Sequence, residues 1–248
     1  MSGHSKWSTI KRAKGKTDVE RGKLFSKLSR EITTSAKTGG GDPAGNPRLR
    51  LAIDKARDAN MPSDNIKRAI QKGTGAGEGI HIDEITYEGY GPGGAAFIVD
   101  VMTDNKNRTL GDLQFILSRN GGNLGKPGSV SWMFAKKGII TFALNVDEEL
   151  VTSVAIDGGA EDISVGKESI DVTTSPDNFE AVRNALQAKG LKPASAEVTM
   201  VPQNSVTVNG EDARKLIKLV SLLEDHDDVQ AVHANFDIPD EILAQVTA

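Results

Sequence analysis

The stretch that decides the fold is residues 205–236, SVTVNGEDARKLIKLVSLLEDHDDVQAVHANF. Its pattern predicts a strand at 205–208, a helix at 210–223 and a strand at 229–236. Two strands and one helix are half of a ferredoxin-like unit and not a whole one. This segment must therefore complete a folding unit that begins earlier in the chain.

The first half of that unit is expected at 83–134. Its pattern predicts strands at 83–89 and 95–102 around the glycine-rich turn GYGPGG, then a helix at about 107–119 and a strand at 129–134. The residues between the two halves carry the complete element order of a ferredoxin-like unit. Its expected strands and helices, in chain order, are 139–144, 147–157, 162–165, 169–174, 176–189 and 194–201.

Helical periodicity dominates the N-terminal part of the sequence. From Asp18 an apolar stripe recurs at steps of three to five residues as far as Ala36, and glycines at 39–41 end the helix. Two shorter helices are expected after Pro47 and near Pro62, which makes a three-helix bundle. Glycine then occupies every second position from 73 to 79, a pattern typical of a flexible linker.

The predicted fold class is therefore multidomain, α and α+β. An N-terminal three-helix bundle is followed by two ferredoxin-like α+β domains, and we predict that the third domain is inserted in the second. Three domains in simple sequence are the alternative, but the two half-units favour insertion. The expected domains are 1–80 with the linker, 81–136 plus 203–248, and 137–202 as the insert.

Charge is distributed unevenly along this chain, whose formal net charge is -4. Residues 1–80 hold 17 Lys and Arg against 8 Asp and Glu, whereas residues 81–248 hold 13 against 26. A basic module on an acidic body directs polyanions to one surface. The alternative is a solvated, lysine-rich surface that binds nothing.

Two groups of basic residues suit contacts with the phosphates of a nucleic acid. One is the arm GHSKWSTIKRAKGKT at 3–17, and the other is a helix face separate from the apolar stripe. Trp7, the tryptophan of the arm, either anchors the arm onto the bundle or stacks on an exposed base. The candidate nucleic-acid-binding residues are Lys6, Trp7, Lys11, Arg12, Lys14, Lys16, Lys23, Lys27 and Arg30.

The sequence gives no indication of an enzyme. The loop GGNLGKPG at 121–128 lacks the spacing and the Ser or Thr of a phosphate-binding loop, and GYGPGG is not followed by a helix. No two histidines have the i, i+4 spacing of a helical metal site. The acidic run EDHDD at 224–228 is interpreted as a solvated turn. We expect no catalytic residue, no cofactor, no metal site and no small-molecule substrate.

Cytoplasmic localisation is expected. No apolar run approaches the roughly 20 residues of a membrane helix, so no membrane association is expected. The opening residues lack the apolar segment of a secretory signal and run into a helix, and cysteine is absent. We therefore take these residues as part of the folded protein.

Several segments closely resemble the signature segments of the YebC family, usually described as probable transcriptional regulators. They are GHSKWSTIKRAKGKTDVERGKLFSKLSREI at 3–32, MPSDNIKRAIQKGTG at 61–75, YEGYGPGG at 87–94, DNKNRTLGDL at 104–113, GGNLGKPGSVSWMF at 121–134 and LEDHDDVQAVHANF at 223–236. The resemblance implies a cytoplasmic bacterial protein with a helical nucleic-acid-binding module and two α+β domains. It also implies kinship with the mitochondrial translational activator of cytochrome oxidase.

Two functions are compatible with these observations. The first is a DNA-binding transcriptional regulator that acts through the basic helical domain. The second is a ribosome- or RNA-binding translation factor, which would assist elongation or activate translation of particular messages through contacts with rRNA or tRNA. Phosphate contacts position a protein without reading sequence, so composition does not separate the two. A homo-oligomer is left open.

Overall fold

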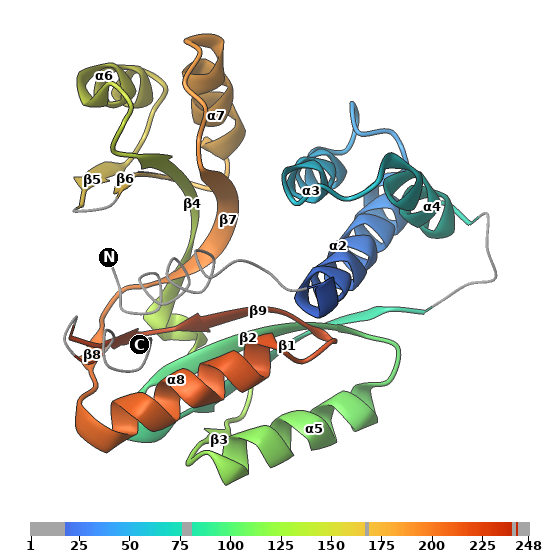
Figure 1. The fold of residues 1–248 in the computed structure, drawn as a ribbon, viewed down its shortest axis with the longest axis vertical. Coiled ribbons are helices and arrows are strands. Elements are labelled where there is room, and N and C mark those ends of the chain that lie inside the picture. The colour runs from blue at the N-terminus through green and yellow to red at the C-terminus, as the bar shows by residue number, and fades with distance from the viewer. Residues whose placement is uncertain (1–17, 76–80, 167–168, 240–241, 243–248) are drawn as a thin grey trace. The chain divides into compact units, whose positions relative to one another are not determined.

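The computed structural model describes residues 18–75, 81–166, 169–239 and 242 (Figure 1). Contacts within the chain divide it into two compact units. One unit runs from Trp132 to Asn204, and the other is built from the chain on both sides of that segment. Residues 205–238 thus pack with residues that precede the insert.

The N-terminal region contains the three expected helices, α2 (Asp18–Gly39), α3 (Pro47–Asp58) and α4 (Ser63–Gly73). Helix α2 packs against both of the shorter helices, so the apolar stripe of each faces a common core. The buried residues of this core are Ile32, Ala36, Leu49, Ala52, Ile53, Ala56, Met61, Ile66 and Ala69. The predicted three-helix bundle is confirmed.

A single buried amide fixes the connection between α2 and α3. The Asn46 side chain caps α3 by accepting a hydrogen bond from the Leu49 N–H (3.1 Å), and its Nδ2 donates to the carbonyls of Ser35 (2.8 Å) and Gly40 (2.9 Å). A Cβ on Gly39 would lie only 2.6 Å from this amide. The glycine therefore allows the close approach on which the cap depends.

The second region is α+β and draws its strands from both sides of the insert. Its sheet has the order β3-β1-β2-β9 with antiparallel neighbours, and β8 pairs with β10 in a small parallel sheet. Before the insert the elements are β1 (Asp83–Tyr90), β2 (Ala96–Thr103), α5 (Lys106–Arg119) and β3 (Asn123–Leu124); after it they are β8 (Val206–Thr207), α8 (Gly210–Glu224), β9 (Val229–Ala234) and β10 (Phe236–Asp237). The 3-10 turn Pro92–Gly94 joins β1 to β2.

Helices α5 and α8 lie on the same face of this sheet (Figure 1). Leu113 and Leu117 of α5 share one core with Leu216 and Leu219 of α8 and with the inward residues of β2 and β9. The Asn235 side chain also accepts a hydrogen bond from the Ala96 N–H (2.7 Å). Residues 205–236 therefore complete a core that the earlier half leaves open.

The inserted unit has the ferredoxin-like topology. Its elements are β4 (Phe134–Ala143), α6 (Glu148–Asp157), β5 (Asp162–Val165), β6 (Ser169–Thr174), α7 (Phe179–Ala188) and β7 (Ser195–Pro202). The strand order is β5-β6-β4-β7, and all neighbours are antiparallel. Ile140 and Phe142 of β4 alternate with less buried residues, as do Ile170 and Val172 of β6, so one sheet face forms the core. The predicted fold class, with its insertion, is confirmed.

The prediction of a strand at 129–134 is wrong. Residues 131–133 form a 3-10 turn, and Phe134 already begins β4 of the insert. The cause is the buried carboxylate of Glu88 on β1, which accepts hydrogen bonds from the N–H groups of Gly128 (2.7 Å), Val130 (2.7 Å) and Ser131 (2.9 Å). Because these donors point at a side chain, they cannot pair with a neighbouring strand.

Hydrogen bonding also sets the protonation of Glu88. Burial by itself would raise the pKa of this carboxyl, but the hydrogen bonds from Val130, Gly128 and Ser131 outweigh burial and hold the pKa below its usual value. The ionised form is therefore the one that the fold stabilises. It anchors the chain at the last residues before the insert.

We expect Glu88→Gln to lower the free energy of unfolding by about 1–3 kcal/mol, because an amide offers only one acceptor oxygen and places an N–H₂ group against buried donors. Urea denaturation of the full chain measures this loss. Since the folded pKa of Glu88 is depressed, its contribution is present above the unfolded pKa of about 4.3 and is lost as the pH falls through the lower folded pKa. The gap between wild type and variant should shrink in that acid range.

The matched control is Glu84→Gln on the same strand. Glu84 forms an exposed ion pair with Arg48 (2.7 Å), and exposed pairs contribute about 0–1 kcal/mol. Equal losses in the two variants would contradict the anchoring role of Glu88.

Candidate nucleic-acid interface

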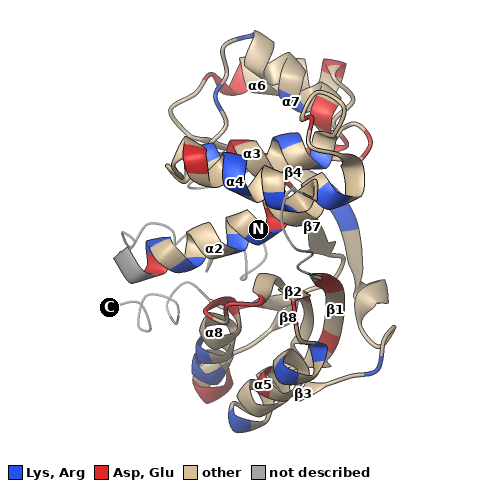
Figure 2. Ribbon diagram, turned by 90° about the vertical axis from the view of Figure 1, so that its right-hand side faces the viewer, with Lys and Arg blue, Asp and Glu red and all other residues tan. Residues whose placement is uncertain are grey.

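The candidate residues divide between two parts of the chain. Lys6, Trp7, Lys11, Arg12, Lys14 and Lys16 lie outside the described residues. Lys23, Lys27 and Arg30 lie on α2 at positions i, i+4 and i+7, which places them on one helix face. Figure 2 shows Lys and Arg positions along α2 and α4.

The three α2 cations contact the C-terminal end of α8 and the residues that follow it. Lys23 Nζ donates to the carbonyl of Asp225 (3.2 Å), Lys27 Nζ donates to the carbonyl of Glu224, and Arg30 Nη1 donates to the carbonyl of Asp227. The last carbonyls of a helix lack partners within the helix and carry partial negative charge. Part of the basic face of α2 therefore neutralises a helix end of the same protein.

Asp228 adds a full negative charge at this contact. Its buried carboxylate forms salt bridges with Arg30 of α2 (3.1 Å) and Arg108 of α5 (2.7 Å), and it accepts a hydrogen bond from the Thr109 hydroxyl (2.7 Å). Only 3% of the Asp228 side chain is exposed. The interpretation of EDHDD as a solvated turn is thus wrong for Asp228, since charges distant in sequence enclose it.

These partners keep Asp228 ionised. Burial would raise the pKa of its carboxyl, but hydrogen bonds from Arg108 and Thr109, together with the charges of Arg30 and Arg108, lower the pKa below its usual value. The hydrogen bond to Asp228 and the charge of that carboxylate, together with Asp104, raise the pKa of Arg108. A permanent charge pair therefore joins α2 to the α+β region.

The cations on α3 and α4, the other helices of the N-terminal region, have different contacts from those on α2. On α3, Arg48 forms salt bridges with Glu31 (3.0 Å) and Glu84 (2.7 Å), and the hydrogen bond to Glu84 is the main reason that the pKa of Arg48 is raised. On α4, by contrast, Arg68 and Lys72 are exposed and form no salt bridge with any described residue. The exposed cations of the described bundle therefore include a pair that the candidate set omitted.

A signal for this pair was present in the sequence. Asn65, Arg68 and Lys72 recur at i, i+3 and i+7, which places them on one face of α4, beside the buried Ala69. The pattern is short, and the basic arm that precedes it has the denser charge.

No group of His, Asp and Glu within the described residues could hold a metal ion, and no described helix is long and apolar enough to cross a membrane.

We expect Asp228→Asn to lower the free energy of unfolding by about 2–3 kcal/mol in urea denaturation. Removing one partner of a fully buried pair costs roughly 3–5 kcal/mol. The loss here is smaller because 30% of the Arg30 side chain and 47% of the Arg108 side chain stay in contact with water. The depressed pKa predicts that this stabilisation is present above the unfolded pKa of about 3.9 and is lost as the pH falls through the folded value.

Asp227→Asn is the control, because Asp227 meets Arg30 through its backbone carbonyl, which the substitution retains. An Asp228→Asn protein as stable as this control would show that the buried charge does not hold α2 in place.

Comparison with known proteins covers nearly the whole chain. The family model for the TACO1/YebC protein N-terminal domain matches residues 5–76, and that for the TACO1/YebC second and third domain matches residues 82–236. A probable transcriptional regulatory protein of Geotalea uraniireducens is 57% identical over 241 residues, covering 97% of this chain and 98% of the relative. One of the same name from Dictyoglomus turgidum is 53% identical, with both chains fully covered.

A solved structure agrees with these matches. The crystal structure of a conserved hypothetical protein from Aquifex aeolicus has a TM-score of 0.84 and 47% sequence identity, and the alignment covers 92% of this chain and 95% of that one. The chain thus has a helical bundle, a split α+β region and an insert. Its sequence matches the two family models over residues 5–76 and 82–236. The chain belongs to the TACO1/YebC family.

Proposed function

We propose that this protein is a nucleic-acid-binding regulator of gene expression, and that it acts as a DNA-binding transcriptional regulator through its basic N-terminal region. The observation that carries the proposal is the uneven charge, 17 Lys and Arg against 8 Asp and Glu in residues 1–80 of an otherwise acidic chain. The name carried by relatives above 50% identity supports regulation of transcription. The proposal places the protein in the cytoplasm and assigns it no enzymatic step.

The contacts of the charged residues suggest separate roles for the arm, for α2 and for the α+β domains. The arm supplies Lys6, Lys11, Arg12, Lys14 and Lys16, which neutralise phosphates and release counterions. Arg30 and its neighbours on α2 connect the bundle to the α+β region, so a nucleic acid bound to the bundle is linked to that region through these contacts. The α+β domains then carry regulation or self-association.

A translation factor is the second candidate. It is favoured by the resemblance to the mitochondrial translational activator and by the chemistry of the site, because cations that contact phosphates serve RNA as well as DNA. In this case the same arm would lie on rRNA or tRNA, and effects on transcription would be indirect.

Crosslinking in growing cells, followed by sequencing of bound DNA and bound RNA from one sample, separates the two functions. Enrichment at discrete promoter DNA is expected for the regulator. Enrichment on ribosomal or transfer RNA without DNA peaks would overturn that assignment and establish the second candidate. Recovery of neither polymer above an untagged control would contradict both.

We expect the triple variant Lys11→Ala, Arg12→Ala, Lys14→Ala to bind nucleic acid more weakly and with a flatter salt dependence than wild type. If about six to ten phosphates are contacted, wild-type affinity falls by roughly 10³ to 10⁵ between 50 and 200 mM salt. Fluorescence anisotropy titrations at several salt concentrations measure both quantities. An unchanged slope would remove the arm from the interface.

A further inference from the structure

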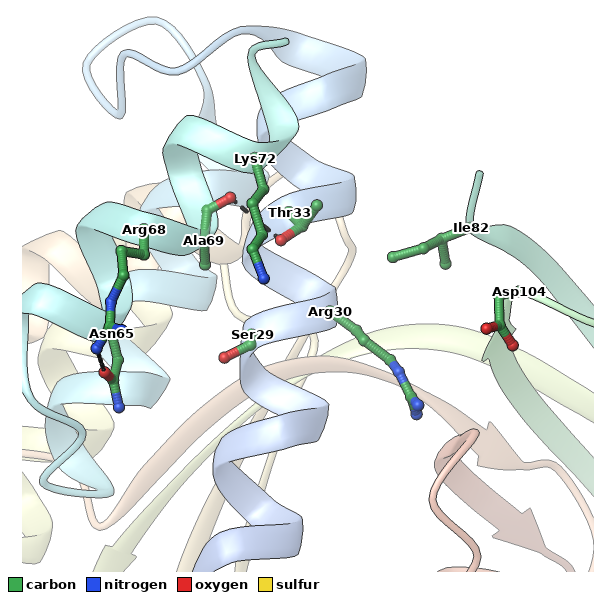
Figure 3. Close-up of a pocket in the computed structure, with 9 residues that line it drawn as sticks. All are labelled: Ser29, Arg30, Thr33, Asn65, Arg68, Ala69, Lys72, Ile82 and Asp104. Carbon is green, nitrogen blue, oxygen red and sulfur yellow. Dashed lines mark hydrogen bonds between the residues drawn. The ribbon is translucent and has the colours of Figure 1, made fainter. Parts of the chain in front are cut away.

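A hollow of about 280 Å³ lies beside the line along which α2 packs on α4 (Figure 3). Its helical walls carry Ser29, Arg30 and Thr33 from α2 and Asn65, Arg68 and Lys72 from α4, and we call it the α2–α4 hollow. Ala69, Ile82 and Asp104 complete the lining. Cations and neutral hydrogen-bonding side chains thus dominate the surface.

We propose that the α2–α4 hollow binds the phosphodiester backbone of a nucleic acid, with Arg68 and Lys72 as the contacting cations. This inference rests on the proposed function and adds to it a site outside the arm. Both residues are exposed on α4, and Lys72 has no hydrogen bond or ion pair with any described residue. Its ammonium group therefore has three donors available for phosphate oxygens.

The hollow has a rigid floor. The Thr33 hydroxyl donates to the carbonyl of Ala69 (3.1 Å), which ties α2 to α4 directly beneath it. At the end of α4, a Cβ on Gly73 would lie 2.3 Å from the Thr33 carbonyl oxygen, so the two backbones approach as closely as glycine permits. Side chains on the two helices are consequently held at a fixed separation, which lowers the entropic cost of binding.

Arg68 is already oriented. Its Nε donates to the carbonyl of Asp64 (3.3 Å), and its Nη2 donates to the Asn65 side-chain oxygen. A guanidinium has five N–H donors, so several remain for an anion after these two bonds. Asn65 keeps its amide N–H₂ group, and Ser29 offers a hydroxyl at the same rim. The donor set suits phosphate oxygens, which accept hydrogen bonds and carry negative charge.

The charge balance also favours an anion. Among the lining residues three are cationic and one, Asp104, is acidic, and Asp104 forms a salt bridge with Arg108 (2.9 Å). Arg30 is engaged by Asp228, which leaves Arg68 and Lys72 as the cations directed to solvent. The backbone of a polymer fits better than a small ion, because both cations lie at an exposed rim that a chain can cross.

The test compares Arg68→Ala/Lys72→Ala with Arg214→Ala/Lys218→Ala in the full chain. The control pair is an Arg and a Lys at the same i, i+4 spacing on the exposed face of α8, so both variants lose equal charge. Each is titrated against labelled duplex DNA and against single-stranded RNA of the same sequence at several salt concentrations. The slope of log affinity against log salt should fall in magnitude by about 1–2 for the α4 variant, at roughly 0.7–0.9 for each lost phosphate contact.

The control should keep the wild-type slope, and the charge-conserving variant Arg68→Lys/Lys72→Arg should regain most of it. A change on DNA alone assigns the phosphates to DNA, and a change on RNA alone assigns them to RNA. If wild type binds either polymer but the α4 variant matches the control on both, the hollow is not an interface, while the proposed function stands. If wild type binds neither polymer, both proposals fall. Thermal unfolding midpoints equal to that of wild type would verify that the variants are folded.

Discussion

Asp228 places a carboxylate inside the protein at a point where three segments of the chain meet. Arg30 comes from α2, Arg108 comes from α5, and Asp228 itself follows α8. Two charged partners and the Thr109 hydroxyl offset the cost of burying this group, and they do so only when all three segments are in place. The contact therefore makes the position of α2 depend on the fold of the α+β region.

The basic residues of the bundle fall into two groups, those that contact other parts of the chain and those that are directed to solvent. A cation that already donates to a helix end or to a buried carboxylate of its own chain has fewer donors and less uncompensated charge to offer a phosphate. Lys23, Lys27 and Arg30 are in that position, whereas Arg68 and Lys72 on α4 are directed to solvent. The positive charge of the bundle is thus divided between cations held by contacts within the chain and cations exposed to solvent. A count of charged residues does not distinguish the two groups.

Glu88 plays a comparable part where the insert begins. Its carboxylate collects three backbone N–H groups from residues 128–131, and the next residues lead into the ferredoxin-like unit. The Tyr90 hydroxyl, which donates to the Ser129 carbonyl (3.1 Å), supports the same loop. The chain is therefore fixed by side chains of β1 before it leaves for the insert, although no regular strand pairing is available there.

The sequence by itself determined the elements and their grouping. Periodicity located the three helices of the bundle and the inserted order of strands and helices, because apolar spacing reflects which face of each element is buried. Residues 205–236 could be recognised as half of a unit for the same reason. Of the candidate site, the sequence supplied the basic arm and the charged face of α2, and it also held the α4 pattern of Asn65, Arg68 and Lys72.

Only the tertiary structure decided what each charge contacts. Lys27 reaches a carbonyl that lies 197 positions away in sequence, and Asp228 is enclosed by arginines from two other helices. The strand expected at 129–134 failed because a carboxylate on β1 took its N–H groups. The spacing of apolar residues within a helix or strand indicates which of its faces is buried. The partner of a charge or of an unpaired N–H group is set by chain packing, which brings together residues that no spacing relates.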